Sequence, residues 1–174
     1  MMKRVREFGQ NALIIKRRDF LENFESELLR GISSLTILSV INEYKRDGTY
    51  GYQISKDLQD KTGSILYIED GTLYPILKKF EKEGVIESEK KVVAGRSRTY
   101  YRLTDEGVKI FNHLEGFMSK LIEAIAPLLD IEVSIKKDRY VYCTNCANKI
   151  DIKNPDIKFC DMCGLNIEDL LRRI

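Results

Sequence analysis

The stretch from Asp70 to Ile86 constrains the fold of this 174-residue chain more than any other. Its apolar residues recur at steps of three and four: Leu73, Ile76, Leu77 and Phe80. This spacing predicts an amphipathic helix that buries one stripe and turns its lysines outward. Pro75 restricts the helix start to nearby residues, because proline is comfortable only in the first helical turn, where no intrahelical amide is needed. Gly84 is a good C-terminal stop, and Val85-Ile86 then begins a strand-like run.

The segments around this helix predict two further helices and a hairpin. A largely buried helix is expected from Glu27 to Tyr44, because its apolar residues cover more than one face. A second helix is expected from about Tyr50 to Lys61, ahead of the helix at 72–83. Two strands, Val85–Val93 and Arg98–Leu103, then pair across a loop that contains glycine. Three helices followed by a hairpin is the order of a winged helix-turn-helix, in which the third helix recognises DNA. An ordinary amphipathic helix has the same periodicity.

The charges of the chain nearly cancel overall but cluster locally. With 29 basic and 27 acidic side chains, the net charge of +2 indicates no particular partner. Residues 1–18 carry six basic side chains against one acidic, and residues 90–102 carry five with no acid. In the second strand, alternation places Arg98, Tyr100 and Arg102 on one face, opposite the face that enters the core. Such blocks favour a surface that meets a polyanion, although solvated faces have the same composition.

A long helix is expected from Thr104 to Asp130, with Thr104 as its N-cap. Its apolar residues form a heptad seam: Phe111, Leu114, Met118, Leu121, Ile125 and Leu128. A second stripe lies beside the seam: Val108, Phe117, Ile122 and Leu129. Two stripes offer more apolar surface than a small domain needs to bury, which favours dimerisation through this helix over packing within one chain. Gly116 weakens the seam, and Pro127 is expected to kink or end the helix.

All four cysteines lie near the end of the chain, as two Cys-x-x-Cys pairs: Cys143, Cys146, Cys160 and Cys163. Each pair forms a tight turn whose thiolates converge on one ion, and two such turns complete a tetrahedral site. We therefore predict one structural Zn²⁺ per chain, with an iron site or thiol redox chemistry as the alternatives. Four protein ligands leave no open position for catalysis. A module of about 35 residues has too little core to fold alone, which the metal would offset.

The sequence contains no pattern that predicts catalysis. It has no glycine-rich phosphate loop, no Gly-x-Ser-x-Gly and no His-Glu-x-x-His, and its single histidine, His113, lies mid-helix as a structural residue. The chain is therefore not expected to be an enzyme. No apolar run reaches the roughly 18 residues of a membrane span, and the N-terminus lacks a signal peptide's apolar core, so a cytoplasmic protein is expected.

The segment from about Leu28 to Gly107 resembles the PadR-type transcriptional regulators. The resemblance rests on four groups of residues: 28–31 (Leu-Leu-Arg-Gly), 51–54 (Gly-Tyr-Gln-Ile), 70–75 (Asp-Gly-Thr-Leu-Tyr-Pro) with Leu77, Glu81 and 84–86, and 95–107 (Gly-Arg-Ser-Arg-Thr-Tyr-Tyr-Arg-Leu-Thr-Asp-Glu-Gly). It implies a homodimeric DNA-binding protein, usually a repressor, in which some members release DNA on binding a small molecule. A small-molecule effector or a protein partner is thus a further possibility beside DNA and a second copy.

The resemblance also implies which residues meet DNA. It directs one group towards the major groove: Thr72, Leu73, Tyr74 and Lys78. Lys79 lies beside Lys78 on the outer face of the same helix and joins the predicted DNA-binding set. Arg96 and Arg98 are expected at the wing tip, on the minor groove or the backbone.

The remainder of the chain departs from the usual pattern of such regulators. One long helix follows Gly107, as in the short subfamily, and the tail at 142–165 resembles a zinc ribbon. The expected organisation is a basic extension at 1–25, a winged helix-turn-helix at 26–103, a dimerisation helix at 104–130 and a zinc-ribbon module at 131–174. The fold class is mainly α with a small β-hairpin. The alternative function is a winged-helix and zinc-ribbon interaction factor of the basal transcription machinery.

Overall fold

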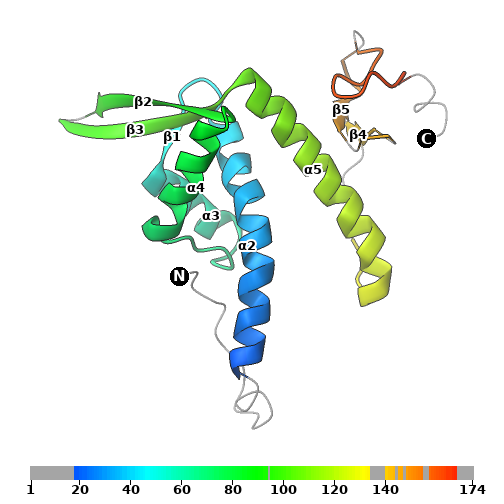
Figure 1. The fold of residues 1–174 in the computed structure, drawn as a ribbon, viewed down its shortest axis with the longest axis horizontal. Coiled ribbons are helices and arrows are strands. Elements are labelled where there is room, and N and C mark those ends of the chain that lie inside the picture. Colours follow the sequence, from blue (N-terminus) through cyan, green and yellow to red (C-terminus); the bar gives the residue numbers. More distant parts are fainter. Residues whose placement is uncertain are drawn as a thin grey trace. The chain divides into compact units, whose positions relative to one another are not determined.

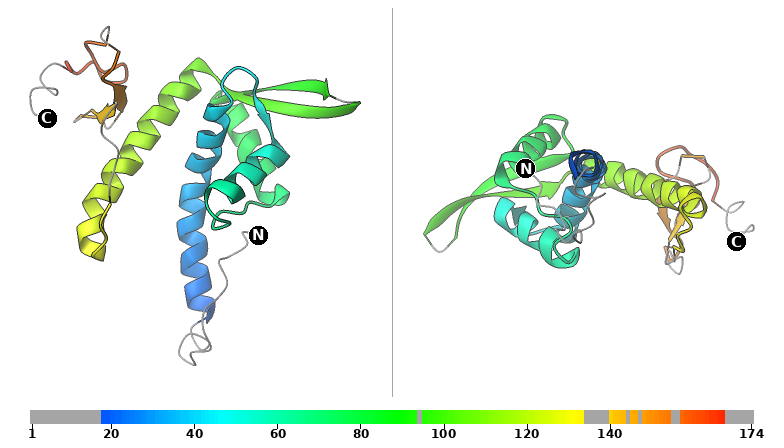
Figure 2. Two further views of the ribbon diagram at one scale, coloured as in Figure 1. Left: turned by 180° about the vertical axis from the view of Figure 1, so that it is seen from behind. Right: turned by 90° about the horizontal axis from the view of Figure 1, so that it is seen from below.

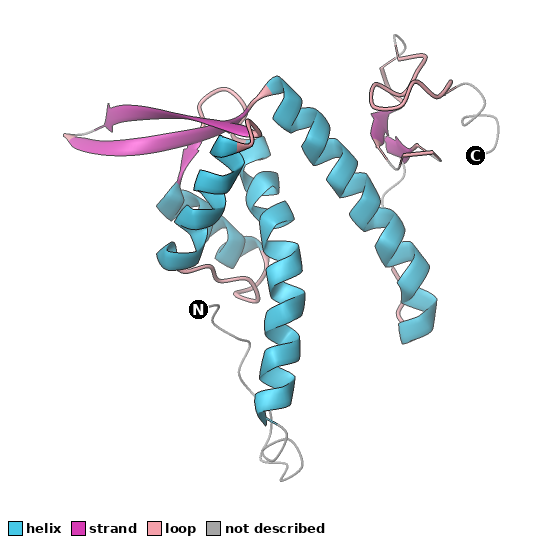
Figure 3. Ribbon diagram, in the orientation of Figure 1, coloured by secondary structure: helices cyan, strands magenta, loops and turns pink. Residues whose placement is uncertain are grey.

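The structure is a computed structural model that describes residues 18–93, 95–133, 140–143, 145–146, 148–154 and 157–167. The chain divides into two compact units, Met1–Thr104 and Asp105–Ile174, and each is described by itself. Helices predominate, with a small sheet in each unit (Figures 1 and 3). The predicted basic extension lies outside the described residues as far as residue 17.

Three helices form the body of the first unit: α2 (Arg18–Glu43), α3 (Gly51–Lys61) and α4 (Asp70–Lys82). Helix α2 begins earlier than the predicted Glu27, so residues 18–25 are helical and continuous with the segment predicted as the first helix of the winged-helix domain. The segment between Arg18 and Glu43 contains no proline that would break the helix. Asp19, in the first turn, stabilises the helix through the interaction of its carboxylate with the positive end of the helix dipole. In Figures 1 and 2 the N-terminal half of α2 extends past α3 and α4.

The core of the first unit lies where the C-terminal half of α2 meets α3, α4 and the sheet. Its buried residues come from all of these elements and from the loop before α4: Ile37, Leu38, Val40, Ile41, Ile54, Leu58, Leu66, Ile68, Leu73, Leu77, Val85, Ile86 and Tyr101. The N-terminal half of α2 instead exposes an apolar stripe at four-residue steps: Phe20, Phe24, Leu28 and Ile32. Only part of the predicted buried helix is therefore in the core.

A three-stranded antiparallel sheet completes the first unit, in the order β1 (Thr49–Tyr50), β3 (Arg96–Leu103), β2 (Ile86–Val93). The predicted loop at 94–97 was too long, because Val93 pairs with Arg96. Gly95 has a φ of +74°, a conformation that glycine adopts without strain and that suits a short hairpin turn. Tyr101 is buried, as the alternation predicted. Strand β1 was not predicted, because two residues show no periodicity.

The second unit contains α5 (Asp105–Ile125), the short 3-10 helix η1 (Ala126–Leu129), and strands β4 (Tyr140–Tyr142) and β5 (Lys149–Asp151). Pro127 lies in the first turn of η1, which confirms the prediction that it ends the long helix. Strands β4 and β5 pair antiparallel and carry a small core: Val141, Cys143, Ile150, Cys160 and Ile167. Among the described residues of the chain, no helix is long and apolar enough to cross a membrane.

Candidate nucleic-acid interface and metal centre

Helix α4 presents one buried face and one open face. Leu73 and Leu77 anchor it in the core with 0% and 1% of their surface exposed, whereas Tyr74 is 46% exposed. Lys78 and Lys79 are exposed as well, and Thr72 is half-buried. The expectation that Leu73 faces the major groove is therefore wrong, since its side chain is part of the core. The other predicted residues of α4 lie on its accessible surface.

The start of α4 also differs from the prediction. The carbonyl of Glu69 accepts hydrogen bonds from the backbone amides of Thr72 and Leu73 at 2.8 and 2.9 Å, so the helix begins at Asp70. Pro75 consequently lies inside the helix and not in its first turn. The carboxylate of Asp70, in the first turn, stabilises the helix by interacting with the positive end of the helix dipole. The helix is therefore two residues longer at its start than the predicted range of 72–83.

Asp57 of α3 accepts hydrogen bonds from Tyr44, the residue after α2, and from Gln53 of α3 itself. The hydroxyl of Tyr44 donates to Asp57 Oδ2 at 2.6 Å, and Gln53 Nε2 donates to Oδ1 at 2.7 Å. The hydrogen bond to Asp57 raises the pKa of Tyr44 to about 12, because ionised Tyr44 could not donate it. Ser55 donates to the carbonyl of Ile68 at 3.1 Å and so fixes α3 against the loop that enters α4. These bonds set the geometry of the helix-turn-helix.

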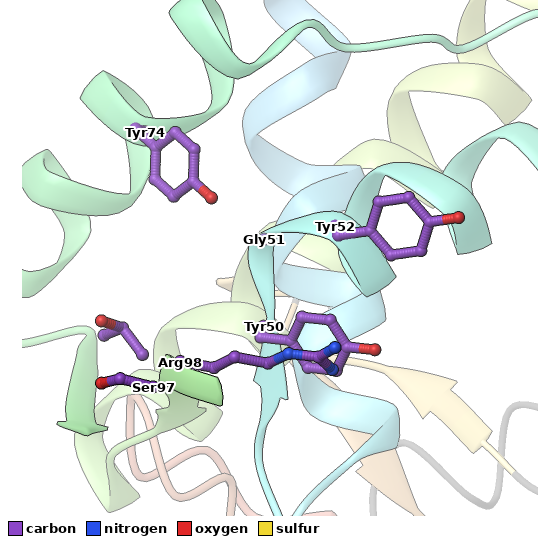
Figure 4. A pocket seen from close by; sticks show the side chains of 7 residues that line it. Tyr50, Gly51, Tyr52, Tyr74, Ser97 and Arg98 are labelled. Carbon is purple, nitrogen blue, oxygen red and sulfur yellow. The ribbon is translucent and has the colours of Figure 1, made fainter. Parts of the chain in front are cut away.

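A cleft of about 370 Å³ lies between the start of α3, helix α4 and strand β3 (Figure 4). It is lined by seven residues: Tyr50, Gly51, Tyr52, Tyr74, Ser97, Arg98 and Thr99. The guanidinium carbon of Arg98 lies 4.4 Å from the centre of the Tyr50 ring. The ring of Tyr74 lies close to Gly51, where a Cβ would be 2.7 Å from the hydroxyl oxygen, so a larger residue at position 51 would require the tyrosine side chain to move. Gly51 and Tyr52 were singled out in the sequence only because they belong to the family resemblance. No pattern in the sequence predicted that Tyr50 is part of this surface.

The wing places its two predicted arginines differently. Arg96 is exposed beside the turn, whereas Arg98 is half-buried over Tyr50, so the expectation that both lie at the tip is wrong for Arg98. The reason is the register, in which Tyr50 pairs with Tyr100 two residues beyond Arg98. Arg102 is engaged elsewhere, because its Nε donates to Glu87 Oε1 at 2.7 Å. The tip also exposes Val92, at 75%.

The four cysteine sulfurs lie within 4.8 Å of one another. Two sulfur pairs, Cys143–Cys163 at 3.6 Å and Cys146–Cys160 at 3.5 Å, are far longer than a disulfide of about 2.05 Å. Tetrahedral Zn²⁺ at about 2.3 Å from each thiolate separates the sulfurs by about 3.8 Å. The donor set therefore fits a four-thiolate metal ion, as the sequence predicted.

The thiols of this cluster differ in acidity. Burial raises the pKa of Cys146 to about 12, whereas a hydrogen bond from Asn145 is the main cause that lowers the pKa of Cys163 to about 6. Burial also raises the pKa of Cys160. A buried thiol with a raised pKa is mostly protonated at neutral pH. A bound cation offsets the free-energy cost of deprotonation, because it stabilises the anionic thiolate.

The four-cysteine module docks on one polar face of α5. Lys149 pairs with Glu115 at 2.6 Å, and Lys120 Nζ donates to the carbonyl of Cys143 at 2.6 Å. The hydroxyls of Ser119 and Tyr142 lie 2.9 Å apart. Tyr142 and Lys149 are cross-strand neighbours, so the edge of the β4–β5 pair that leads into the first cysteine turn is held on the helix.

The predicted dimerisation seam is only partly accessible. Leu114, Leu121 and Ile125 are 37–40% exposed, and Met118 is half-buried. Phe111 is 5% exposed and therefore belongs to the interior of the chain, which corrects its place in the seam. Leu128 is 84% exposed but lies in η1, beyond the end of α5. The second stripe adds exposed surface: Val108 and Phe117 on α5, and Leu129 in η1.

A helix-turn-helix whose second helix presents an open face, followed by a β-hairpin, defines the winged helix-turn-helix class of DNA-binding proteins. The family model of the PadR-like transcriptional regulators matches residues 37–113. The fold is similar to that of a PadR family regulator from Eggerthella lenta (TM-score 0.57, 30% identity, 68% of this chain and 99% of that one) and of a transcriptional regulator from Clostridium thermocellum (TM-score 0.53, 32% identity, 59% and 98%).

A curated protein of Lysinibacillus sphaericus is 33% identical over 107 residues, which cover 61% of this chain and 89% of that protein. The chain belongs to the PadR-like family of transcriptional regulators. It is therefore a DNA-binding regulator and not an enzyme, as the sequence predicted.

Proposed function

We propose that this regulator is a sequence-specific homodimeric repressor that places α4 in the major groove. The observation that carries the proposal is the open face of α4, where Tyr74, Lys78 and Lys79 lie opposite the buried Leu73 and Leu77. A helix fixed by its apolar face holds its outer side chains in a defined position, and such a helix fits the major groove.

In the proposed interface, α4 and the wing contact different parts of the DNA. Thr72, Tyr74 and Lys78 are the candidates for contact with base edges or nearby phosphates. Arg96, exposed beside the wing turn, is the candidate for the minor groove or the backbone. Base contacts specify a site, whereas phosphate contacts position the protein on any sequence.

Dimerisation through α5 is the second part of the proposal. The helix leaves Leu114, Leu121 and Ile125 accessible along one face, and this surface supports pairing with a second copy. A symmetric dimer would present two recognition helices at a spacing near one DNA turn, about 34 Å. The division of the chain at Thr104 and Asp105 supports separate roles for the winged helix and for the α5 region.

One structural Zn²⁺ per chain, in a zinc-ribbon module, is the third part. Its ligands would be all four cysteines: Cys143, Cys146, Cys160 and Cys163. A fully ligated ion supplies folding free energy and no catalytic position. The sulfur separations of 3.5 and 3.6 Å support this assignment over disulfide bonds.

The proposed function is tested by replacing Tyr74 and comparing two DNAs, an operator selected from random duplexes by repeated binding and a random duplex of equal length. Tyr74→Ala should weaken operator binding by about 1–3 kcal/mol and random binding much less, if the ring meets bases. Tyr74→Phe keeps the ring and separates its contact from that of the hydroxyl. If Tyr74→Ala leaves the preference for the operator intact, α4 does not recognise the DNA sequence. The alternative function, a winged-helix and zinc-ribbon interaction factor of the basal transcription machinery, then replaces this proposal.

A further inference from the structure

The four-cysteine module contacts α5 through one of its own cysteines. The ammonium group of Lys120, on α5, donates a hydrogen bond to the backbone carbonyl of Cys143 at 2.6 Å. One residue earlier on each side, the hydroxyls of Ser119 and Tyr142 lie 2.9 Å apart. Cys143 is completely buried in the core of the module, so the position of its backbone depends on the packing of the cysteine turns.

Hydrogen bonds also connect the second cysteine turn to the first. The carbonyl of Asn148, a residue that is 1% exposed, accepts a hydrogen bond from the backbone N–H of Cys143 at 2.8 Å. The side-chain amide of Asn148 donates to Asp161 Oδ1, in the second turn, at 2.6 Å. A metal ion held by all four sulfurs would join the same two turns. The segment that would hold the metal is therefore the segment that contacts α5.

A second attachment to α5 comes from strand β5. Lys149 pairs with Glu115 of α5 at 2.6 Å, and its ammonium group lies 4.0 Å from the centre of the Tyr140 ring on β4. Both strands contribute to this arrangement, and they enclose the first cysteine turn. The attachment should therefore be lost when the module unfolds.

The attached residues of α5 lie beside the seam proposed for dimerisation and do not cover it. Glu115 follows Leu114 and Lys120 precedes Leu121, so each lies about 100° around the helix from a seam residue. Leu114 and Leu121 are 37% and 40% exposed with the module in place. Most helical stability in proteins comes from packing against other elements, and the module supplies packing to α5 while leaving the seam open. A helix that is already ordered loses less conformational entropy when it binds a partner.

We propose that the four-cysteine module is a metal-dependent clamp on α5, so that two copies pair more tightly when its cysteines hold a thiophilic divalent cation such as Zn²⁺. In the metal-bound state the module is folded and attached to Glu115, Ser119 and Lys120. In the metal-free state the module unfolds, and α5 loses these three contacts. Tighter pairing strengthens operator binding, so the regulator responds to the supply of the metal. This inference rests on the proposed dimer and the proposed metal ion, and it adds the coupling between them.

The first test measures the dimer dissociation constant of the full chain by analytical ultracentrifugation in reducing buffer, with Zn²⁺ and after chelation. Chelation should raise the constant about tenfold, a size usual for coupling between two sites, and re-addition of Zn²⁺ should reverse the change. A dimer that forms equally well, or better, without Zn²⁺ overturns the clamp alone. A chain that is monomeric in both states overturns the proposed dimer as well, so the two failures are distinguishable.

The second test detaches the module from α5 without touching a cysteine. The double variant Lys120→Met, Lys149→Met should still bind one Zn²⁺ per chain but pair about as weakly as the metal-free wild type. Lys153→Met is the matched control, because Lys153 is an exposed lysine of the module, and it should keep both tight pairing and its dependence on Zn²⁺. A double variant that still responds tenfold to Zn²⁺ overturns the clamp.

The third test uses the wild type alone. Because coupling between two binding events is reciprocal, dimerisation must strengthen metal binding by the factor by which the metal strengthens dimerisation. Two metal ions divide the factor of about ten, so the affinity of each site for Zn²⁺ should rise about threefold from monomer to dimer. Competition with a chromophoric chelator, below and above the dimer dissociation constant, measures this change. Equal affinities in monomer and dimer overturn the clamp.

Discussion

The winged-helix unit and the four-cysteine module are stabilised in different ways. The first buries aliphatic side chains from α2, α3, α4 and the sheet, with Ile37, Ile41 and Leu73 completely inaccessible. The core of the module consists of five residues, of which Cys143 and Cys160 are two. The module therefore has few apolar groups to bury, and its cysteines converge where a metal ion would join both turns. Hydrophobic burial stabilises the winged-helix unit, whereas the proposed metal ion would stabilise the four-cysteine module.

The largest expected effect separates these two sources of stability. Cys160→Ser, or chelation of the metal, should unfold the four-cysteine module, because a structural zinc supplies on the order of 10 kcal/mol. The helices of the winged-helix unit should persist, since their core contains no cysteine. Elemental analysis should find one zinc per chain in the wild type, and hydrogen exchange should show loss of protection confined to β4, β5 and the cysteine turns.

Re-addition of zinc after chelation is the control for that experiment and should restore protection in the wild type alone. Iron in place of zinc would change the metal assignment. A metal-replete preparation that contains no metal would contradict the account of the module.

The reverse change weakens the first unit and spares the second. Leu77→Ala removes a side chain that is 1% exposed and should destabilise the winged helix by about 2–5 kcal/mol through lost burial and a residual cavity. Zinc content should remain at one per chain. Denaturant unfolding followed by far-UV circular dichroism measures the loss. Leu128→Ala is the control, because an 84% exposed leucine should contribute within about 0.5 kcal/mol.

A smaller effect is expected from the hydrogen bond between Tyr44, the residue after α2, and Asp57 of α3. Tyr44→Phe should cost about 1 kcal/mol at pH 8, where Tyr44 is neutral and donates to Asp57. The pKa of Tyr44 is raised from 10.0 to about 12, so its contribution is complete below pH 10, where both the folded and the unfolded chain hold the proton. As the pH rises from 10 to 12 the contribution is lost. The difference in unfolding free energy between wild type and Tyr44→Phe should therefore shrink at pH 11, and a constant difference would contradict this role.

The smallest effect concerns the docking of the module on α5. The pair between Lys149 and Glu115 is partly buried, with side-chain exposures of 19% and 32%, and its loss in Lys149→Ala should cost about 1 kcal/mol or less. The expected readout is faster hydrogen exchange in β4 and β5 with zinc content unchanged. Arg102→Ala, which breaks an exposed pair in the wing, should leave exchange in the module as it is.

Local patterns were sufficient to predict part of this architecture. The three- and four-residue steps around Leu73 and Leu77 located α4, and the two Cys-x-x-Cys pairs located the cluster. Contacts between distant residues were not predictable in the same way. Arg98 lies over Tyr50 only because β1 pairs with β3, and a strand of two residues has no pattern of its own. The burial of Phe111 and the early start of α2 likewise depend on packing and on the absence of a helix breaker.

We propose that two copies joined through α5 place two winged helices on one DNA duplex. Light scattering of the protein alone and with a selected operator tests it most directly. The wild type should have twice the chain mass of 20.2 kDa and bind as two chains per duplex. Leu121→Asp, at a 40% exposed position of the seam, should halve the mass and weaken operator binding, whereas Lys109→Asp outside the seam should do neither. A wild type that is monomeric at micromolar concentration, both free and on DNA, would contradict the account.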